Sequence, residues 1–297
     1  MSLSAFQNNA ATKAFFVERL KSHLEQDQVT RDLASWDGTQ GSPTGCTAHG
    51  DLKQYELLTG IPAGLGWLHD WMFAYEGHSS EEALALTWLE TIEPGQDLGQ
   101  VEIRFVLWMF EAEKFGVLNL ARQLLGKISA EVVAVLETTA YLYRQSLERE
   151  VPADQWKALR MRAVGVADQS TGRVNQHLVA IAEACAWAPG TALTATVDGM
   201  RNWQTAHNLL VGQSVGWSDD WEALWDAVKA KTETYAEEHQ IEDREEFFGV
   251  YSGFMQQEPE LAERLQVQQA ALAVEESARE LYKRQQLLAL VREAPEA

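Results

Sequence analysis

Basic residues are scarce in this chain. Its 297 residues include 24 Lys and Arg against 44 Asp and Glu, which gives a formal net charge of −20. A field of that sign repels the phosphates of nucleic acids and of anionic membrane surfaces. The nearest approach to a basic cluster is Lys157, Arg160 and Arg162, and Asp154 and Asp168 stand close to it. We therefore expect no direct binding to nucleic acid or membrane, and a basic protein is the partner that the charge favours.

Cysteine is almost absent, with only Cys46 and Cys185 in the sequence. The first residues contain no basic stretch followed by an apolar run, so no secretory signal is expected. Charged residues interrupt every apolar run well before the ~18 residues that a membrane-spanning helix needs. These features predict a soluble, cytoplasmic protein whose two thiols are reduced.

Strand patterns are also lacking, because runs of alternating β-branched and aromatic residues hardly occur. Apolar residues instead recur every three to four positions from end to end, which indicates helices. The sequence predicts an all-α fold, an irregular bundle of about ten helices. A weak boundary near residue 150 suggests an N-terminal region, 1–150, and a C-terminal region, 151–297. One continuous domain is the alternative.

Two segments depart from regular helix chemistry. Residues 36–50 contain four glycines and a proline, and this composition predicts a glycine-rich loop after the first helix, which is expected over residues 11–26. The last five residues, 293–297, follow the final predicted helix and are expected to fray.

Tryptophan is abundant, and three of the eleven residues form one pattern. Trp217, Trp221 and Trp225 are spaced by four, as on one face of a helix. Residues 218–246 around them hold eleven acidic and three basic residues. The stripe is interpreted as core of an amphipathic helix, with a ligand cage or partner groove as the alternative. The acidic residues are interpreted as a solvated face or as a docking surface for a basic partner.

No nucleotide-binding or hydrolase motif is present. The sequence contains no P-loop, no dinucleotide-binding glycine pattern and no G-x-S-x-G elbow. His177, His207 and His239 each stand without a second ligand at helical spacing. The sequence therefore names no cofactor.

The most unusual stretch is Gly45–Asp51, where Cys46 and His49 stand three residues apart between glycines. A thiolate beside an imidazolium is a workable nucleophile. The same two residues are ligands that zinc prefers, and His23, His69 or nearby carboxylates would have to complete such a site through folding. In the alternative interpretation Cys46 is a small buried apolar residue.

Two carboxylates near this stretch extend the hypothesis. Glu56 and Asp70, together with Cys46 and His49, are the candidate catalytic residues, because a histidine and two carboxylates suit general acid–base chemistry. Adjacent residues on a helix point about 100° apart, so His69 and Asp70 do not face each other. Asp70 could equally accept hydrogen bonds from the backbone amides of the irregular segment.

The order of residues from Gly45 to Phe73 resembles a signature of a family of uncharacterised bacterial and prophage proteins. The likeness is carried by Gly45-Cys46-x-x-His49, Tyr55-Glu56, Gly60-Ile61-Pro62 and Leu68-x-Asp70-x-x-Phe73. A further cysteine expected before Cys46 is replaced by Ser42 or Pro43. The resemblance implies a bacterial or phage origin, and it implies no activity.

Three functions are compatible with the sequence. A non-enzymatic helical binding or interaction protein ranks first, because no complete catalytic set is present. An enzyme or metal-binding protein centred on Cys46 and His49 ranks second. An acidic inhibitor that imitates nucleic acid and occupies a basic groove ranks third.

Overall fold

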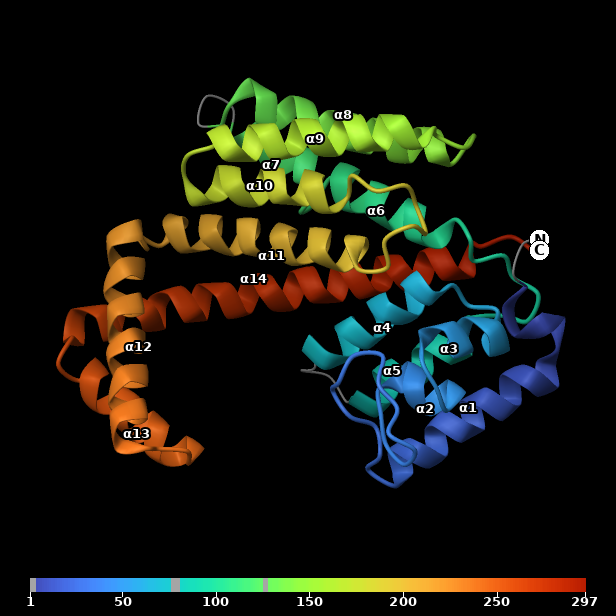
Figure 1. Ribbon diagram of the computed structural model, residues 1–297, viewed down its shortest axis with the longest axis horizontal. Coiled ribbons are helices and arrows are strands. Elements are labelled where there is room, and N and C mark those ends of the chain that lie inside the picture. The colour runs from blue at the N-terminus through green and yellow to red at the C-terminus, as the bar shows by residue number, and fades with distance from the viewer. Residues whose placement is uncertain (1–3, 76–80, 125–127) are drawn as a thin grey trace. The chain divides into compact units, whose positions relative to one another are not determined.

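The protein is all-α over residues 4–75, 81–124 and 128–297, which are the residues that the computed structural model describes (Figure 1). Over these ranges no strand is formed, and the β-structure is limited to isolated bridges. None of the helices described there is long and apolar enough to cross a membrane. The elements are a 3₁₀-helix η1 (Ala5–Asn8) and the α-helices α1 (Ala10–Glu25), α2 (Pro43–Ala48), α3 (Leu52–Thr59), α4 (Ala63–Tyr75), α5 (Glu81–Thr91), α6 (Val101–Glu111), α7 (Val117–Gln123), α8 (Ala130–Ser146), α9 (Ala153–Gln169), α10 (Arg173–Ala184), α11 (Ala195–Ser214), α12 (Asp219–His239), α13 (Arg244–Met255) and α14 (Pro259–Arg292).

The all-α class is thus confirmed, but the predicted count of about ten helices is too low, since the described ranges hold fourteen. The segment 36–50 is not a continuous loop, because α2 lies within it. Its start is well capped: the Ser42 side chain accepts a hydrogen bond from the Gly45 amide, and Pro43 occupies the first helical turn.

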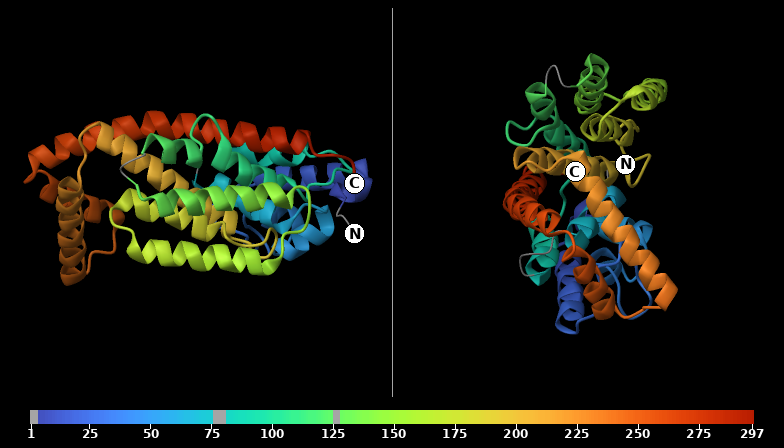
Figure 2. Two further views of the ribbon diagram at one scale, coloured as in Figure 1. Left: turned by 90° about the horizontal axis from the view of Figure 1, so that it is seen from above. Right: turned by 90° about the vertical axis from the view of Figure 1, so that its left-hand side faces the viewer.

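The chain forms two compact units. Unit 1 consists of residues 1–204 and 280–297, and unit 2 of residues 205–279. This division falls elsewhere than the boundary near residue 150 that the sequence suggested. Within unit 1, α1 to α5 pack on one another, and α6 packs with α8, α9 and α10 in a second group of helices (Figures 1 and 2).

Large aromatic side chains fill the interior of unit 1. Trp203 is 1% exposed, and its indole Nε1 donates to the Phe115 carbonyl at 2.7 Å. Its ring meets Trp108 edge-on at a centroid distance of 6.3 Å. Val101, Phe105 and Met109 of α6 are buried, as the apolar pattern of this helix predicts.

Residues near the two ends of the chain bind the same turn of unit 1. The Ala5 amide donates to the Gln96 carbonyl at 2.9 Å, and the Ala297 amide donates to the Gly95 carbonyl at 2.8 Å. The Gln96 side chain donates to the Val291 carbonyl at 3.0 Å. The prediction that residues 293–297 fray is therefore wrong, because backbone hydrogen bonds hold this tail.

Unit 2 has a hydrophobic core of its own. Trp217 is 6% exposed and packs with Val228, Met255, Leu261 and Leu265, while Trp221 and Trp225 lie partly buried against them. The interpretation of the tryptophan stripe as core is confirmed. Trp217 stands just before the α12 cap, Ser218, and donates from its indole to Glu222 in the first turn of α12 at 2.7 Å.

Gly45 is required by a close approach inside unit 1. The carbonyl of Ser35 lies so near its Cα that a Cβ would overlap it. The same carbonyl accepts a hydrogen bond from the Ser42 amide at 3.0 Å. Gly45 thus lets the irregular segment 26–42 lie directly on α2.

We predict opposite effects for two glycine-to-alanine changes. Gly45→Ala should lower the free energy of unfolding by about 2 kcal/mol, because the added methyl group must displace backbone. Gly165→Ala, inside α9 with nothing within 4 Å of the added Cβ, should raise it by ~0.5–1 kcal/mol. Urea denaturation followed by circular dichroism measures both, and equal effects would contradict the packing described here.

Candidate functional site

Cys46 lies on α2 with no exposed surface. Its Sγ donates to the carbonyls of Gly41 at 3.3 Å and Gln28 at 3.6 Å. Burial raises the pKa of the thiol to about 12, and the carboxylates of Asp70 and Asp37 add to the rise. At neutral pH the group is therefore a thiol, which neither attacks as a nucleophile nor binds a metal as a thiolate.

His49 points away from this buried thiol and is exposed. It ends α2 in the left-handed conformation, with φ of 54°. Its ring stacks on Trp36 with centroids 4.4 Å apart and planes 5° apart, and its Nε2 lies 2.8 Å from Nε2 of His23. Folding therefore brings His49 to His23, one of the partners considered from the sequence, and not to the Cys46 thiol.

Asp70 is completely buried in α4 and is surrounded by hydrogen-bond donors. Its carboxylate accepts from the Ala34 amide at 3.1 Å, from the Thr44 amide at 3.0 Å and from the Thr44 hydroxyl. Burial raises its pKa to about 6, and these hydrogen bonds oppose the rise. The side chain thus satisfies the backbone of the irregular segment, as the second interpretation of its sequence position proposed.

Glu56 also has a structural partner. Its Oε2 accepts a hydrogen bond from the Ala63 amide, the first residue of α4, at 2.7 Å. His69 is buried and stacks on Trp88 at 5.2 Å, and burial lowers its pKa to about 3. The candidate residues therefore lie on the neighbouring helices α2, α3 and α4, but their polar atoms serve separate contacts. No group of three or more His, Cys, Asp or Glu suited to a metal is found in the described part of the chain.

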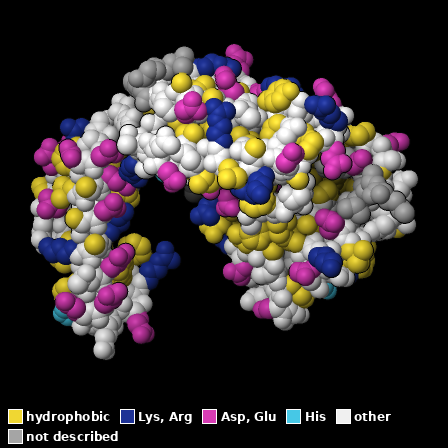
Figure 3. All heavy atoms as spheres, turned by 45° about the horizontal axis from the view of Figure 1, so that its top comes forward, with side chains coloured by type: hydrophobic (Ala, Val, Ile, Leu, Met, Phe, Trp, Pro, Cys, Tyr) yellow, Lys and Arg dark blue, Asp and Glu magenta, His cyan; other side chains and the backbone are white. Residues whose placement is uncertain are grey.

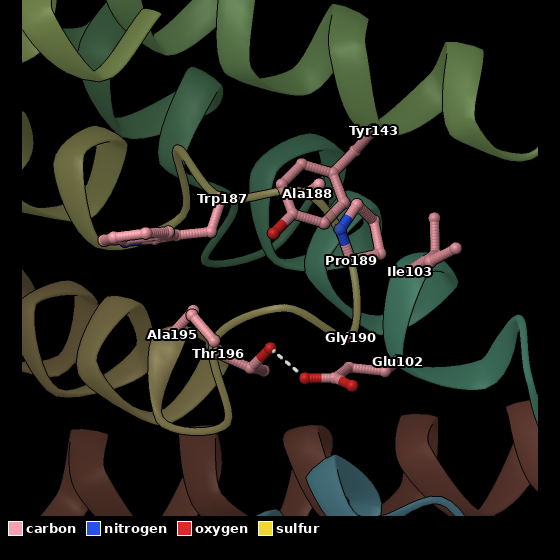
Figure 4. A pocket seen from close by; sticks show the side chains of 10 residues that line it. Glu102, Ile103, Tyr143, Trp187, Ala188, Pro189, Gly190, Ala195 and Thr196 are labelled. Carbon is pink, nitrogen blue, oxygen red and sulfur yellow. Dashed lines mark hydrogen bonds between the residues drawn. The ribbon is translucent and has the colours of Figure 1, made fainter. Parts of the chain in front are cut away.

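A half-buried carboxylate that the sequence did not reveal lies on α6. The Glu102 carboxylate accepts from the Thr196 hydroxyl at 2.6 Å, and the Tyr143 ring closes the same space from α8 (Figure 4). Burial raises the pKa of Glu102, and the Thr196 hydrogen bond opposes this. Gly64 touches the carboxylate so closely that a Cβ there would overlap it. The signal in the sequence was an acidic residue inside a very apolar helix.

The space beside Glu102 is small. Its volume is about 10 Å³, which is the room that one water molecule needs. Tyr143, Trp187 and Pro189 cover it (Figure 4). This arrangement has the acid and hydroxyl groups of a catalytic site but no room for a substrate.

A larger hollow is found in unit 2. An open groove of about 530 Å³ runs between α13 and the first half of α14, a size typical of ligand sites. Apolar and polar side chains share its walls, which consist of Tyr251, Ser252, Met255, Gln256, Pro259, Ala262, Glu263 and Gln266.

The charge of the protein concentrates in the same unit. Residues 205–279 make up about a quarter of the chain and hold sixteen acidic and five basic residues, so they carry eleven of the twenty net negative charges. In Figure 3, acidic and apolar side chains are interspersed on the face in view. Acidic residues outnumber basic residues about threefold in this unit.

Four of the five basic residues of unit 2 lie over aromatic rings. Their charged groups are 3.9 to 5.9 Å from the ring centroids, in the pairs Lys229 with Trp225, Lys231 with Phe254, Arg244 with Phe248 and Arg264 with Trp221. Lys229 also forms an ion pair with Asp226 at 2.6 Å. Three of these rings, Trp221, Trp225 and Phe254, pack against the core of the unit, so the basic groups above them lie close to it.

Comparison with protein-family models, with curated proteins and with solved structures finds no match. The resemblance to a bacterial and prophage family therefore stays an expectation from the motif between Gly45 and Phe73.

We predict that both thiols are inert in the folded protein. Cys46 and Cys185 are buried, and burial raises the pKa of each. A thiol-specific disulfide reagent at about pH 8 should label neither residue until the protein is unfolded in guanidinium, when it should label two. Rapid labelling of the native protein that disappears in Cys46→Ser would restore the nucleophile hypothesis.

Removing the donor to Glu102 should destabilise the protein in a pH-dependent way. The pKa of Glu102 is raised in the folded state, so its contribution to stability falls as pH rises through that folded value. Thr196→Val leaves the ionised carboxylate without its hydroxyl donor and should cost about 1–3 kcal/mol near pH 8, and less near pH 5.

The matched variant for this experiment is Glu102→Gln, which keeps an acceptor for Thr196 and removes the charge. Its stability should vary less with pH than that of the original protein. Equal losses for Thr196→Val at both pH values, measured by urea denaturation, would show that Glu102 does not ionise in this range.

Proposed function

We propose that the chain is a non-enzymatic interaction protein whose unit 2 binds a basic, amphipathic helix of a partner protein. The observation that carries the proposal is the groove between α13 and α14 in a unit with eleven excess negative charges. A groove between two helices accepts the apolar face of a third helix. Surrounding carboxylates then attract the basic face and speed its association.

The charge and the shape of the groove together indicate which kind of helix it binds. Tyr251, Met255 and Ala262 offer an apolar floor, and Glu263 places a carboxylate on the wall. A purely apolar helix would bring no basic group to Glu263, and a purely basic chain would leave the apolar floor of the groove exposed to water. A helix with Leu or Met on one face and Lys or Arg on the other satisfies both.

The other functions have less support. An enzyme centred on Cys46 and His49 needs a reactive thiol, whereas burial raises the pKa of Cys46 to about 12. An imitation of nucleic acid needs carboxylates arranged as a continuous row, whereas on the face drawn in Figure 3 the acidic side chains stand among apolar ones. A bacterial or phage setting, with a basic protein as partner, is part of the proposal.

The experiment uses a fluorescent, helix-forming Leu/Lys peptide of about five turns, with a scrambled peptide of equal composition as control. Anisotropy should show binding of the amphipathic peptide to the full chain, weaker at high salt because ions screen the carboxylates. The scrambled peptide should bind weakly. Equal binding of both peptides would show that charge alone attracts them, and it would contradict the proposal that the groove is the binding site.

Two matched pairs of variants locate the site. Ala262→Trp fills the groove and should weaken binding about tenfold or more, whereas Ala270→Trp, at an exposed position two turns further along α14, should not. Glu263→Lys should weaken binding more than Glu260→Lys, which stands outside the groove. Peptide binding that is insensitive to Ala262→Trp and Glu263→Lys contradicts the proposal.

A further inference from the structure

Two imidazoles from different helices meet at the surface of unit 1. His23 stands in the last turn of α1, and His49 ends α2. Their Nε2 atoms are 2.8 Å apart, and the ring centroids are 5.0 Å apart. Neither residue is buried, so solvent reaches the pair.

The tautomer of His23 follows from its second hydrogen bond. Its Nδ1 lies 2.6 Å from Oε1 of Gln28. An amide oxygen only accepts, so the His23 proton is on Nδ1 and the lone pair of Nε2 faces His49. This arrangement, with an acceptor on one ring nitrogen and a lone pair on the other, is typical of metal-binding histidines. His49 in turn donates its Nε2 proton to His23.

Trp36 orients the second imidazole. Its ring stacks on His49 at 4.4 Å and meets the edge of His23 at 5.3 Å. Both rings are thus held in place by contacts other than the one between them.

We infer that His23 and His49 bind a late first-row divalent cation, with zinc as the ion to test, through their two Nε2 atoms. Imidazole suits zinc, copper and nickel better than it suits magnesium or calcium. Tetrahedral Zn–N bonds of ~2.0–2.1 Å place two nitrogens roughly 3.3 Å apart, so the Nε2 atoms must separate by about 0.5 Å and both rings must turn until their lone pairs converge on the ion. Water, or a group from a binding partner, would complete the coordination.

Cys46 does not belong to this site, although it lies three residues from His49. Its thiol donates to the Gln28 and Gly41 carbonyls. Gln28 therefore has two roles: its backbone carbonyl holds the buried thiol, and its side chain orients His23. Two other histidines differ from this pair, since His177 bonds Asn202 and His239 bonds the Tyr235 carbonyl.

Binding requires one proton to move on His49. In the pair without metal this proton lies on Nε2, between the two rings. A cation on both Nε2 atoms needs that lone pair, so the proton leaves Nε2 and another is taken from solvent at Nδ1. No net proton is released when both rings start neutral, and the change of tautomer is a signature of binding at this site.

The test is calorimetric titration of the full chain with zinc chloride in a non-chelating buffer near pH 7.5. We expect one ion per chain, and losses in affinity of at least ~tenfold in His23→Gln and in His49→Asn. Asparagine tolerates the left-handed conformation at residue 49, so this variant preserves the end of α2. His239→Ala, an exposed histidine of unit 2, is the matched control and should bind zinc normally.

Two further measurements separate a site from incidental binding. Gln28→Ala should lower the affinity for zinc about tenfold, because it releases the His23 ring without removing a ligand. Long-range ¹H–¹⁵N spectra of the imidazoles should show the His49 proton at Nε2 before zinc and at Nδ1 after it. Absence of zinc binding, or equal affinity in the His23→Gln and His49→Asn double variant, would overturn the inference.

Discussion

The carboxylate of Asp70 is the contact on which the irregular part of unit 1 depends. It accepts hydrogen bonds from residue 34 in the segment after α1 and from residue 44 in α2, while its own backbone belongs to α4. Donors from two pieces of chain that also pack on each other thus converge on one buried acceptor. Trp36 belongs to the segment after α1, and His49 ends α2. The stacking of the Trp36 and His49 rings therefore relies on the Asp70 carboxylate, which contacts neither ring.

The sequence predicted the helical class and most helices, and its errors have identifiable causes. Helix α2 was hidden because glycine and proline are usually read as breaks, whereas Pro43 here occupies a first turn capped by Ser42. Helix α13 was missed because only its first residues, at the end of the acidic run 218–246, carry a helix signal, in which Asp243 supplies a cap for the Glu246 amide. The tail beyond residue 292 looked disordered because its partners, residues 95–97, are almost two hundred positions away.

The contact between His23 and His49 was predicted from the sequence only in part. His49 was identified, with His23 among several possible partners, because spacing along the chain does not show which imidazoles meet in space. Cys46 looked reactive because sequence alone does not give burial, and burial decides its protonation. Glu102 was passed over because its apolar neighbours suggested a plain core helix, and only the tertiary structure reveals the Thr196 hydroxyl beside it.

The hydrogen bonds that join residues 5, 95–97 and 291–297 bear on the chain entropy that folding must overcome. Unit 2 is one uninterrupted stretch of chain, and its core residues all come from that stretch. Unit 1 is discontinuous, and the turn at Gln96 gains its partners only when residues almost two hundred positions away reach it. Closing that long loop costs more chain entropy than bringing the core of unit 2 together, so the acidic unit has the shorter route to its native contacts.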